Sequence, residues 1–507
     1  MRWLILVPLE KKSCQGFFYQ KTFSYLIKLG HEIIGYVADK PLKVNPDFHG
    51  GMYINNLIFY SEKELNYEIQ KDKQSNYIDE VEKYLKNAEF LHTYFRITDR
   101  MMAKPQSAGF RLRMFRLTIS YWINLLNKHS IDTVFFGSTP HFGFDTLLAM
   151  ICYEKKVKVL YSARTEFDGM YFIRENWKNL MVLKRVKKYS FEINSQVLNA
   201  NWIKYSKNLV SESLLHNKQL DDSYVYVFKD KVIFYLMLFK RTINIFFKMV
   251  SYRSVESFIF MANINYIEYI SLFLKRKKQN RQQWNLYKKL SSSFNLPKNY
   301  IFLPLSFQPE RSTDPEANFF ADFEFSIQYI IESLPKNWYL VIKEHPRQFD
   351  GKNTDLRKLH GRGNDFYNFS ARLSQVCYSP PELDSSELIK FSRGCIVTTG
   401  SVGYESAMCG KPVGCLSFPW YSGYAGCYDV SNRLRLNKFI SVCQNNTSRK
   451  FSYQVFIKYI KRIHIEYSFK MPSKLDTFNK YPVNRLKEDA RELATALNYF
   501  DFSSLKK

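Results

Sequence analysis

A histidine stands at the end of a short apolar segment in the C-terminal half of the chain. The segment WYLVIK, residues 338–343, is typical of a buried strand, and Glu344, His345 and Pro346 follow it directly. A protonated histidine donates hydrogen bonds to phosphate oxygens and stabilises the charge of a leaving phosphate. Pro346 restricts the residue before it to an extended conformation, which helps to hold the imidazole in place. Alone, a histidine at a strand end is more often structural, so this candidate phosphate ligand needs a partner.

A second candidate anion site follows the strand expected at residues 395–398. Thr399, Gly400 and Ser401 form the turn into a predicted helix, where free backbone N–H groups and the helix dipole attract anions. Glu405, one turn later, can accept hydrogen bonds from ribose hydroxyls. The alternative is that Ser401 only caps the helix and Glu405 is solvated. Because the strand-end histidine is expected in the same sheet, a nucleotide phosphate site is the better interpretation.

The elements that must position these residues alternate between strands and helices in two parts of the chain. This alternation occurs in residues 1–185 and again in residues 296–480, and it predicts in each part a Rossmann-like, doubly wound parallel sheet. We expect residues 186–295 to form a helical segment rich in basic and aromatic residues, and residues 481–507 to form a C-terminal helix. Two such sheets predict a cleft between them, with ligands at the carboxyl ends of the strands.

The amino-acid composition limits the kinds of partner that the protein is expected to bind. The chain has 74 Lys and Arg against 47 Asp and Glu, a net charge of +27, which implies an anionic partner. No zinc-finger, ribonucleoprotein or basic-zipper signature is present, so nucleic acid is not expected. The basic-aromatic helices suit a membrane surface with anionic lipid, or equally a solvated helical face. No apolar run is long enough for a signal peptide or a spanning helix, so we expect a cytoplasmic protein, at most peripheral on the inner face of the membrane.

Three segments of the C-terminal half resemble the capsule polysaccharide biosynthesis family, whose best-known members transfer Kdo from CMP-Kdo. They are FLPLSFQPERSTDPEA at residues 302–317, ESLPKNWYLVIKEHPRQF at 332–349 and IVTTGSVGYESAMCGKPVGCL at 396–416. The resemblance implies a GT-B-like architecture, an α/β fold with two Rossmann-like domains facing one cleft and the donor nucleotide on the C-terminal one. Bacterial sialyltransferases share the His-Pro element and a Ser/Thr-rich element for CMP.

The resemblance also assigns roles to residues. It implies that His345 and Ser401 hold the CMP phosphate, that Thr399 and Gly400 shape its loop, and that Glu405 contacts the nucleoside. It places three further residues at the mouth of the same cleft: Gln308, Glu310 and Arg311.

The catalytic groups are expected on the N-terminal domain. Glycosyl transfer needs a carboxylate or an imidazole to activate the acceptor hydroxyl, and a retaining enzyme can also use a carboxylate nucleophile. Glu166 and Asp168, in a loop expected after a strand, are the first candidates, and His141 and Asp145 in an earlier loop come next. For each of them a capping or surface role is equally open. No DxD-type pair and no metal-ligand spacing of Cys or His is present, so we expect neither a metal nor a cofactor.

The predicted function is transfer of Kdo or another CMP-activated sugar from a nucleotide-sugar donor to a glycan or lipid-linked acceptor. One alternative is a CDP-polyol phosphate transferase of the teichoic-acid type, which also releases CMP. Another is a non-catalytic, membrane-associated protein of polysaccharide assembly or export. The latter would bind liposomes through Lys240, Arg241 and Lys275–Lys278 and would bind no nucleotide.

Overall fold

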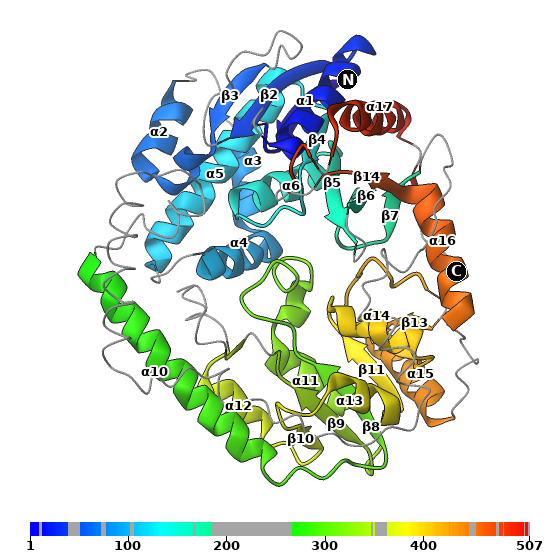
Figure 1. Ribbon diagram of the computed structural model, residues 1–507. Coiled ribbons are helices and arrows are strands. Elements are labelled where there is room, and N and C mark those ends of the chain that lie inside the picture. Colours follow the sequence, from blue (N-terminus) through cyan, green and yellow to red (C-terminus); the bar gives the residue numbers. More distant parts are fainter. Residues whose placement is uncertain are drawn as a thin grey trace. The chain divides into compact units, whose positions relative to one another are not determined.

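The structure, a computed structural model, divides into two compact units (Figure 1). The N-terminal unit contains Met1–Thr98, Gln106–Val197 and Tyr459–Lys506, and the C-terminal unit contains Asp99–Pro105 and Leu198–Lys458 together with Lys507. The structure describes residues 1–9, 13–38, 51–71, 78–101, 106–165, 169–184, 266–345, 348–349, 362–424, 426–445, 453–472, 476–479, 481–500 and 502–504.

The N-terminal unit is built on a nine-stranded sheet whose first part is parallel. Its strand order is β3-β2-β1-β4-β5, so the chain builds outward from β1 in both directions. The strands read as nearly continuous apolar runs because helices cover both faces of a parallel sheet. These five strands are β1 (Arg2–Leu6), β2 (Glu32–Ala38), β3 (Met52–Asn55), β4 (Thr133–Phe136) and β5 (Lys158–Arg164).

The second part of this sheet is antiparallel and uses the end of the chain. β6 pairs with β5, β7 pairs with β6, and two strands from the last fifty residues pair with β6 and β7. The C-terminal segment therefore completes the N-terminal sheet. The four strands are β6 (Met170–Arg174), β7 (Met181–Leu183), β14 (Ser468–Lys470) and β15 (Phe502–Ser504).

Helices cover both faces of the N-terminal sheet. α1 (Cys14–Lys28) begins where the Ser13 hydroxyl accepts a hydrogen bond from the Gly16 amide, and it packs with α17 (Val483–Tyr499) on one face. On the other face, Trp122 and Leu147 belong to a second buried cluster. The remaining helices of this half are η1 (Asn56–Tyr60), α2 (Glu62–Gln70), α3 (Ile78–Leu85), α4 (Ala88–Met101), α5 (Ala108–His129) and α6 (Phe144–Glu154), and α16 (Tyr453–Tyr467) precedes β14.

The C-terminal unit contains a six-stranded sheet in which all pairings are parallel. Its strand order is β10-β9-β8-β11-β12-β13, which is the order 3-2-1-4-5-6 of a Rossmann-type sheet. The strands are β8 (Tyr300–Pro304), β9 (Tyr339–Lys343), β10 (Val376–Tyr378), β11 (Gly394–Val397), β12 (Val413–Cys415) and β13 (Cys427–Asp429). The helices are α10 (Tyr266–Ser291), η3 (Asn318–Ala321), α11 (Phe323–Ile331), α12 (Asn364–Ser370), α13 (Ser385–Phe391), α14 (Ser401–Met408) and α15 (Arg433–Gln444).

Two Rossmann-like α/β sheets in one chain confirm the expected fold class, whereas the cleft between them stays a prediction. The division of the chain differs from the expected bounds, because Tyr459–Lys506, which begins inside the expected C-terminal domain, belongs to the N-terminal unit. Of the expected basic-aromatic segment, residues 186–265, including Lys240 and Arg241, lie outside the described residues, and α10 forms most of the rest. No helix in the described part of the chain is long and apolar enough to cross a membrane.

Candidate functional site

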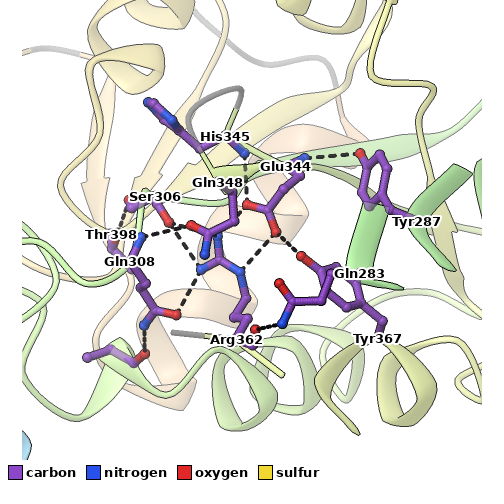
Figure 2. A network of polar contacts seen from close by, with 11 residues as sticks. Gln283, Tyr287, Ser306, Gln308, Glu344, His345, Gln348, Arg362, Tyr367 and Thr398 are labelled. Carbon is purple, nitrogen blue, oxygen red and sulfur yellow. Dashed lines mark hydrogen bonds and ion pairs between the residues drawn. The ribbon is translucent and has the colours of Figure 1, made fainter. Parts of the chain in front are cut away.

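The candidate site lies at the carboxyl ends of β8, β9 and β11. The strand order reverses between β8 and β11, and ligands of such sheets bind at this switch point. Two hydroxyl side chains mark the point: Ser306 follows β8, Thr398 follows β11, and their oxygens lie 2.9 Å apart (Figure 2). The sheet therefore brings the two sequence motifs, from residues 306–312 and 398–405, to one edge.

His345 follows β9 at this edge and is half-buried. Its backbone is fixed on both sides: the amide donates to Glu344 Oε1 at 2.8 Å, and the carbonyl accepts from the Gln348 amide at 2.8 Å. The imidazole lies 5.7 Å from the ring of Phe307. In Figure 2 the imidazole points away from the carboxylate of Glu344. Pro346, which was expected to hold the ring in place, lies outside the described residues.

The start of α14 supplies the second candidate anion site. Gly400, not Ser401, is the N-cap residue, and no side chain caps this helix end in the described structure. The Ser401 hydroxyl instead donates to Glu405 Oε1 at 3.3 Å, so the interpretation of Ser401 as a simple cap is wrong. Thr399 donates to the Ser312 carbonyl at 2.6 Å and thereby ties the turn to the loop after β8. A helix start with no side-chain cap leaves its first N–H groups to water or to an anionic ligand.

The three residues expected at the mouth of the site have different partners. Gln308 accepts from Arg362 at 2.9 Å and donates to the Ala321 carbonyl at 2.8 Å, so it belongs to the polar network of Figure 2. Glu310 accepts from the Ser312 hydroxyl at 2.8 Å. Arg311 forms an ion pair with Glu316 at 3.1 Å, within the same loop. The structure thus joins Gln308 to the candidate site through hydrogen bonds and gives the other two residues partners close in sequence.

A buried ion pair behind His345 escaped the sequence analysis. The side chains of Glu344 and Arg362 are 2% and 3% exposed and contact each other through both carboxylate oxygens. The Tyr367 hydroxyl donates to Glu344 Oε2 at 2.7 Å, and burial together with the charge of Glu344 raises the pKa of Tyr367 well above its ordinary value. Arg362 lies in a stretch without a strand or helix signal, so only the abrupt end of the strand at Glu344 pointed to this pair.

Asp145 and His141 lie together after β4 in the N-terminal unit. The buried carboxylate of Asp145 accepts hydrogen bonds from the amides of His141 and Phe142 at 3.0 and 2.6 Å. Burial raises the pKa of Asp145 to about 6, although these hydrogen bonds oppose the shift. His141 Nδ1 lies 2.7 Å from the Thr139 carbonyl oxygen, so in the neutral ring Nδ1 carries the proton and Nε2 is the basic nitrogen.

The other two catalytic candidates, Glu166 and Asp168, lie outside the described residues. The strand expected before them is β5, which ends at Arg164. Among the described residues, no group of three or more His, Cys, Asp and Glu side chains could hold a metal ion.

The strand order of both sheets defines an α/β protein with two Rossmann-like units. Residues 244–470 match the family described as "Capsule polysaccharide biosynthesis protein". This matched region is less than half of the chain, and it contains the whole candidate site of the C-terminal sheet. A search of curated proteins gave no significant match.

Solved structures with some similarity come from several enzyme classes. "Thermosulfurimonas dismutans KpsC, beta Kdo 2,7 transferase" is 14% identical, with a TM-score of 0.23, over 64% of this chain and 78% of that chain. A UDP-GlcNAc 2-epimerase from Methanocaldococcus jannaschii is 13% identical, with a TM-score of 0.24, over 91% and 99%. A glycosyltransferase from Rickettsia africae is 11% identical, with a TM-score of 0.22, over 99% of both chains. Matches at this level carry no argument about the reaction.

Proposed function

We propose that this protein is a glycosyltransferase of surface-polysaccharide biosynthesis that takes its sugar from a nucleotide donor bound at the carboxyl end of the C-terminal sheet. The observation that carries the proposal is that His345 and the start of α14 follow β9 and β11, the strands on either side of β8, at the carboxyl edge of one Rossmann-type sheet, within the region matched by the capsule family. Both groups suit a phosphate: the imidazolium by charge and the helix start by its N–H groups.

In this proposal the donor is a CMP-activated sugar, with Kdo as the first candidate. His345 and the α14 start hold the phosphate, while Thr399 and Gly400 shape the turn. Glu405 contacts the ribose hydroxyls, and its hydrogen bond from Ser401 at 3.3 Å orients the carboxylate. As the sugar leaves, negative charge develops on the phosphate, and a protonated His345 stabilises it.

The acceptor hydroxyl requires a base, and His141 is our candidate among the described residues. The contact of Nδ1 with the Thr139 carbonyl leaves Nε2 as the proton acceptor, and Asp145 holds the loop by accepting the amide of His141. Glu166 and Asp168 stay proposed as base or nucleophile.

Contact with anionic lipid is a separate proposal. It rests on three of the exposed basic residues of α10, Lys275, Lys278 and Arg281. Sedimentation with phosphatidylglycerol vesicles tests it, and loss of binding is expected when these three residues are replaced by Gln.

A donor screen tests the proposed activity. The protein is incubated with CMP-Kdo, UDP- and GDP-hexoses and CDP-glycerol in the presence of lipid-linked glycan acceptors, and the product mass is measured. The proposal predicts a product heavier by one sugar residue, formed from CMP-Kdo or another CMP-activated sugar. A gain of one glycerol phosphate would identify the polyol phosphate alternative, and the absence of transfer from every donor would refute a transferase.

A further inference from the structure

The polar network behind His345 contains a full positive and a full negative charge, both almost completely removed from water (Figure 2). Burying an ion pair costs desolvation energy, and well-packed apolar residues are often as stabilising in its place. Stability alone therefore does not explain why Glu344 and Arg362 lie next to the candidate phosphate site.

The guanidinium of Arg362 joins the segments that follow two strands. It donates to the Ser306 carbonyl at 3.1 Å from both terminal nitrogens and to Gln308 Oε1 at 2.9 Å, which are groups of the loop after β8. It also pairs with Glu344 and donates to Gln348 Oε1 at 3.3 Å, after β9. Two aromatic rings, Phe323 and Phe366, lie 5.0 and 5.7 Å from its central carbon and complete its enclosure.

The carboxylate of Glu344 lies directly against the backbone of His345. Glu344 Oε1 accepts a hydrogen bond from the His345 amide at 2.8 Å. The backbone amide of Glu344 donates to the Tyr287 hydroxyl oxygen at 3.1 Å. This arrangement sets the direction in which the imidazole leaves the strand. Glu344 also carries a negative charge on the residue next to the proposed phosphate ligand, and like charges repel strongly where water is excluded.

We propose that Arg362 is a positioning residue for donor binding, which neutralises Glu344 and fixes the loops after β8 and β9 so that His345 can accept a phosphate. The inference rests on the proposed nucleotide site and adds a residue to it. Arg362 itself is not a phosphate ligand, because its five N–H groups face Glu344, Ser306, Gln308 and Gln348.

If Arg362 acts by neutralising Glu344, substitutions of these two residues should change the affinity for CMP in opposite directions. Arg362→Met leaves the charge of Glu344 without its counter-ion, so the affinity for CMP should fall by at least about tenfold. Glu344→Gln leaves an extra positive charge near the phosphate, so CMP affinity should be kept or increased. The double variant Arg362→Met with Glu344→Gln removes both charges and should recover most of the affinity lost in the single Arg362 variant. Arg362→Lys keeps the charge and loses the forked geometry, and should lie between wild type and Arg362→Met.

Titration calorimetry with CMP and with cytidine measures these effects on the full-length protein. Cytidine lacks the phosphate, so the predicted losses should appear in the ratio of CMP affinity to cytidine affinity. A general loss of folded structure would instead lower both affinities and leave the ratio unchanged. Arg393→Met is the matched control, since Arg393 donates to Asn299 at 3.1 Å at the opposite, amino-terminal end of β11.

Two outcomes would overturn the inference: an unchanged affinity ratio in Arg362→Met, or an equal fall in Glu344→Gln. If Arg362→Met does not fold, Arg362→Lys and Glu344→Gln still test the opposite signs. A wild-type protein that binds no nucleotide would refute the proposed function instead, so the two failures are distinguishable.

Discussion

Burial shifts the pKa values of His464 and Asp145 in opposite directions. His464 on α16 is fully buried, its ring lies 5.4 Å from that of Phe172 on β6, and burial lowers its pKa to about 3. Asp145 shows the opposite sign for the same reason, because burial disfavours the charged form of an acid and raises its pKa. Both shifts couple protonation to stability.

The buried His464 should make the protein sensitive to mild acid. In the unfolded chain His464 is protonated below its ordinary pKa of 6.5, whereas in the folded protein it stays neutral down to about pH 3. The free energy of unfolding therefore falls as the pH decreases through this window. Between pH 7 and pH 5 this group should lower the free energy of unfolding by about 2 kcal/mol. Urea unfolding of His464→Leu at both pH values should show a pH dependence smaller by that amount. The exposed His92→Gln serves as control, and equal pH dependence in wild type and His464→Leu would contradict the account.

The sequence predicted the position of His345 at the end of a buried strand but not the buried ion pair beside it. An apolar run ending in a histidine is visible along the chain, and so is the turn at Thr399–Ser401. The partner of Glu344 was not predictable, because Arg362 is 18 residues away with no pattern that brings the two together. Pairs of this kind depend on how loops return to a sheet, which periodicity does not encode.

At the scale of elements, the packing of α14 against β11 determines where the candidate anion site lies. Gly403 faces the strand so closely that an added Cβ would lie 2.4 Å from the Tyr421 hydroxyl oxygen and 2.7 Å from Val397 Cγ2. Tyr421 in turn donates to the Gly400 carbonyl. The absence of a side chain at Gly403 thus allows the helix start to reach the switch point.

Gly403→Ala should therefore push α14 away from β11. We expect a loss of about 1–3 kcal/mol in the free energy of unfolding, larger than the gain in helix propensity, together with weaker nucleotide binding. Gly400→Ala is the control for stability, since its nearest neighbour, Ser306 Oγ, would be at an ordinary 3.7 Å. Equal unfolding midpoints for the two variants would show that the close packing has no consequence.

At the scale of the whole molecule, the C-terminal segment of the chain is part of the N-terminal unit. β14 and β15 extend the N-terminal sheet, and α17 packs with α1, so the last fifty residues are part of the first unit. The strand-helix alternation predicted the C-terminal sheet and the parallel part of the N-terminal sheet, because buried parallel strands are uniformly apolar. It did not predict the antiparallel strands, three of which have only three residues and so carry no periodicity that distinguishes them from loops.

Substitution of Leu493 on α17 tests whether the C-terminal segment stabilises the N-terminal unit. Leu493 is fully buried in the cluster shared with α1, and Leu493→Ala should lower the free energy of unfolding by about 2–5 kcal/mol. Hydrogen exchange followed by mass spectrometry should then show faster exchange in α1, far away in sequence, and no change in β8 and β9. Leu434 on α15 is 65% exposed, and Leu434→Ala should change stability by less than about 0.5 kcal/mol. Unaltered exchange in α1 would mean that α17 does not support it.

The most direct test of the central claim is calorimetric titration of CMP and cytidine into the wild-type protein and His345→Ala. If His345 holds the donor phosphate, wild type binds CMP more tightly than cytidine, and the variant loses roughly 10- to 100-fold in CMP affinity, the worth of one charged hydrogen bond, while its cytidine affinity stays the same. Absence of nucleotide binding by the wild-type protein, or CMP affinity that is indifferent to His345→Ala, would contradict the assignment of this site.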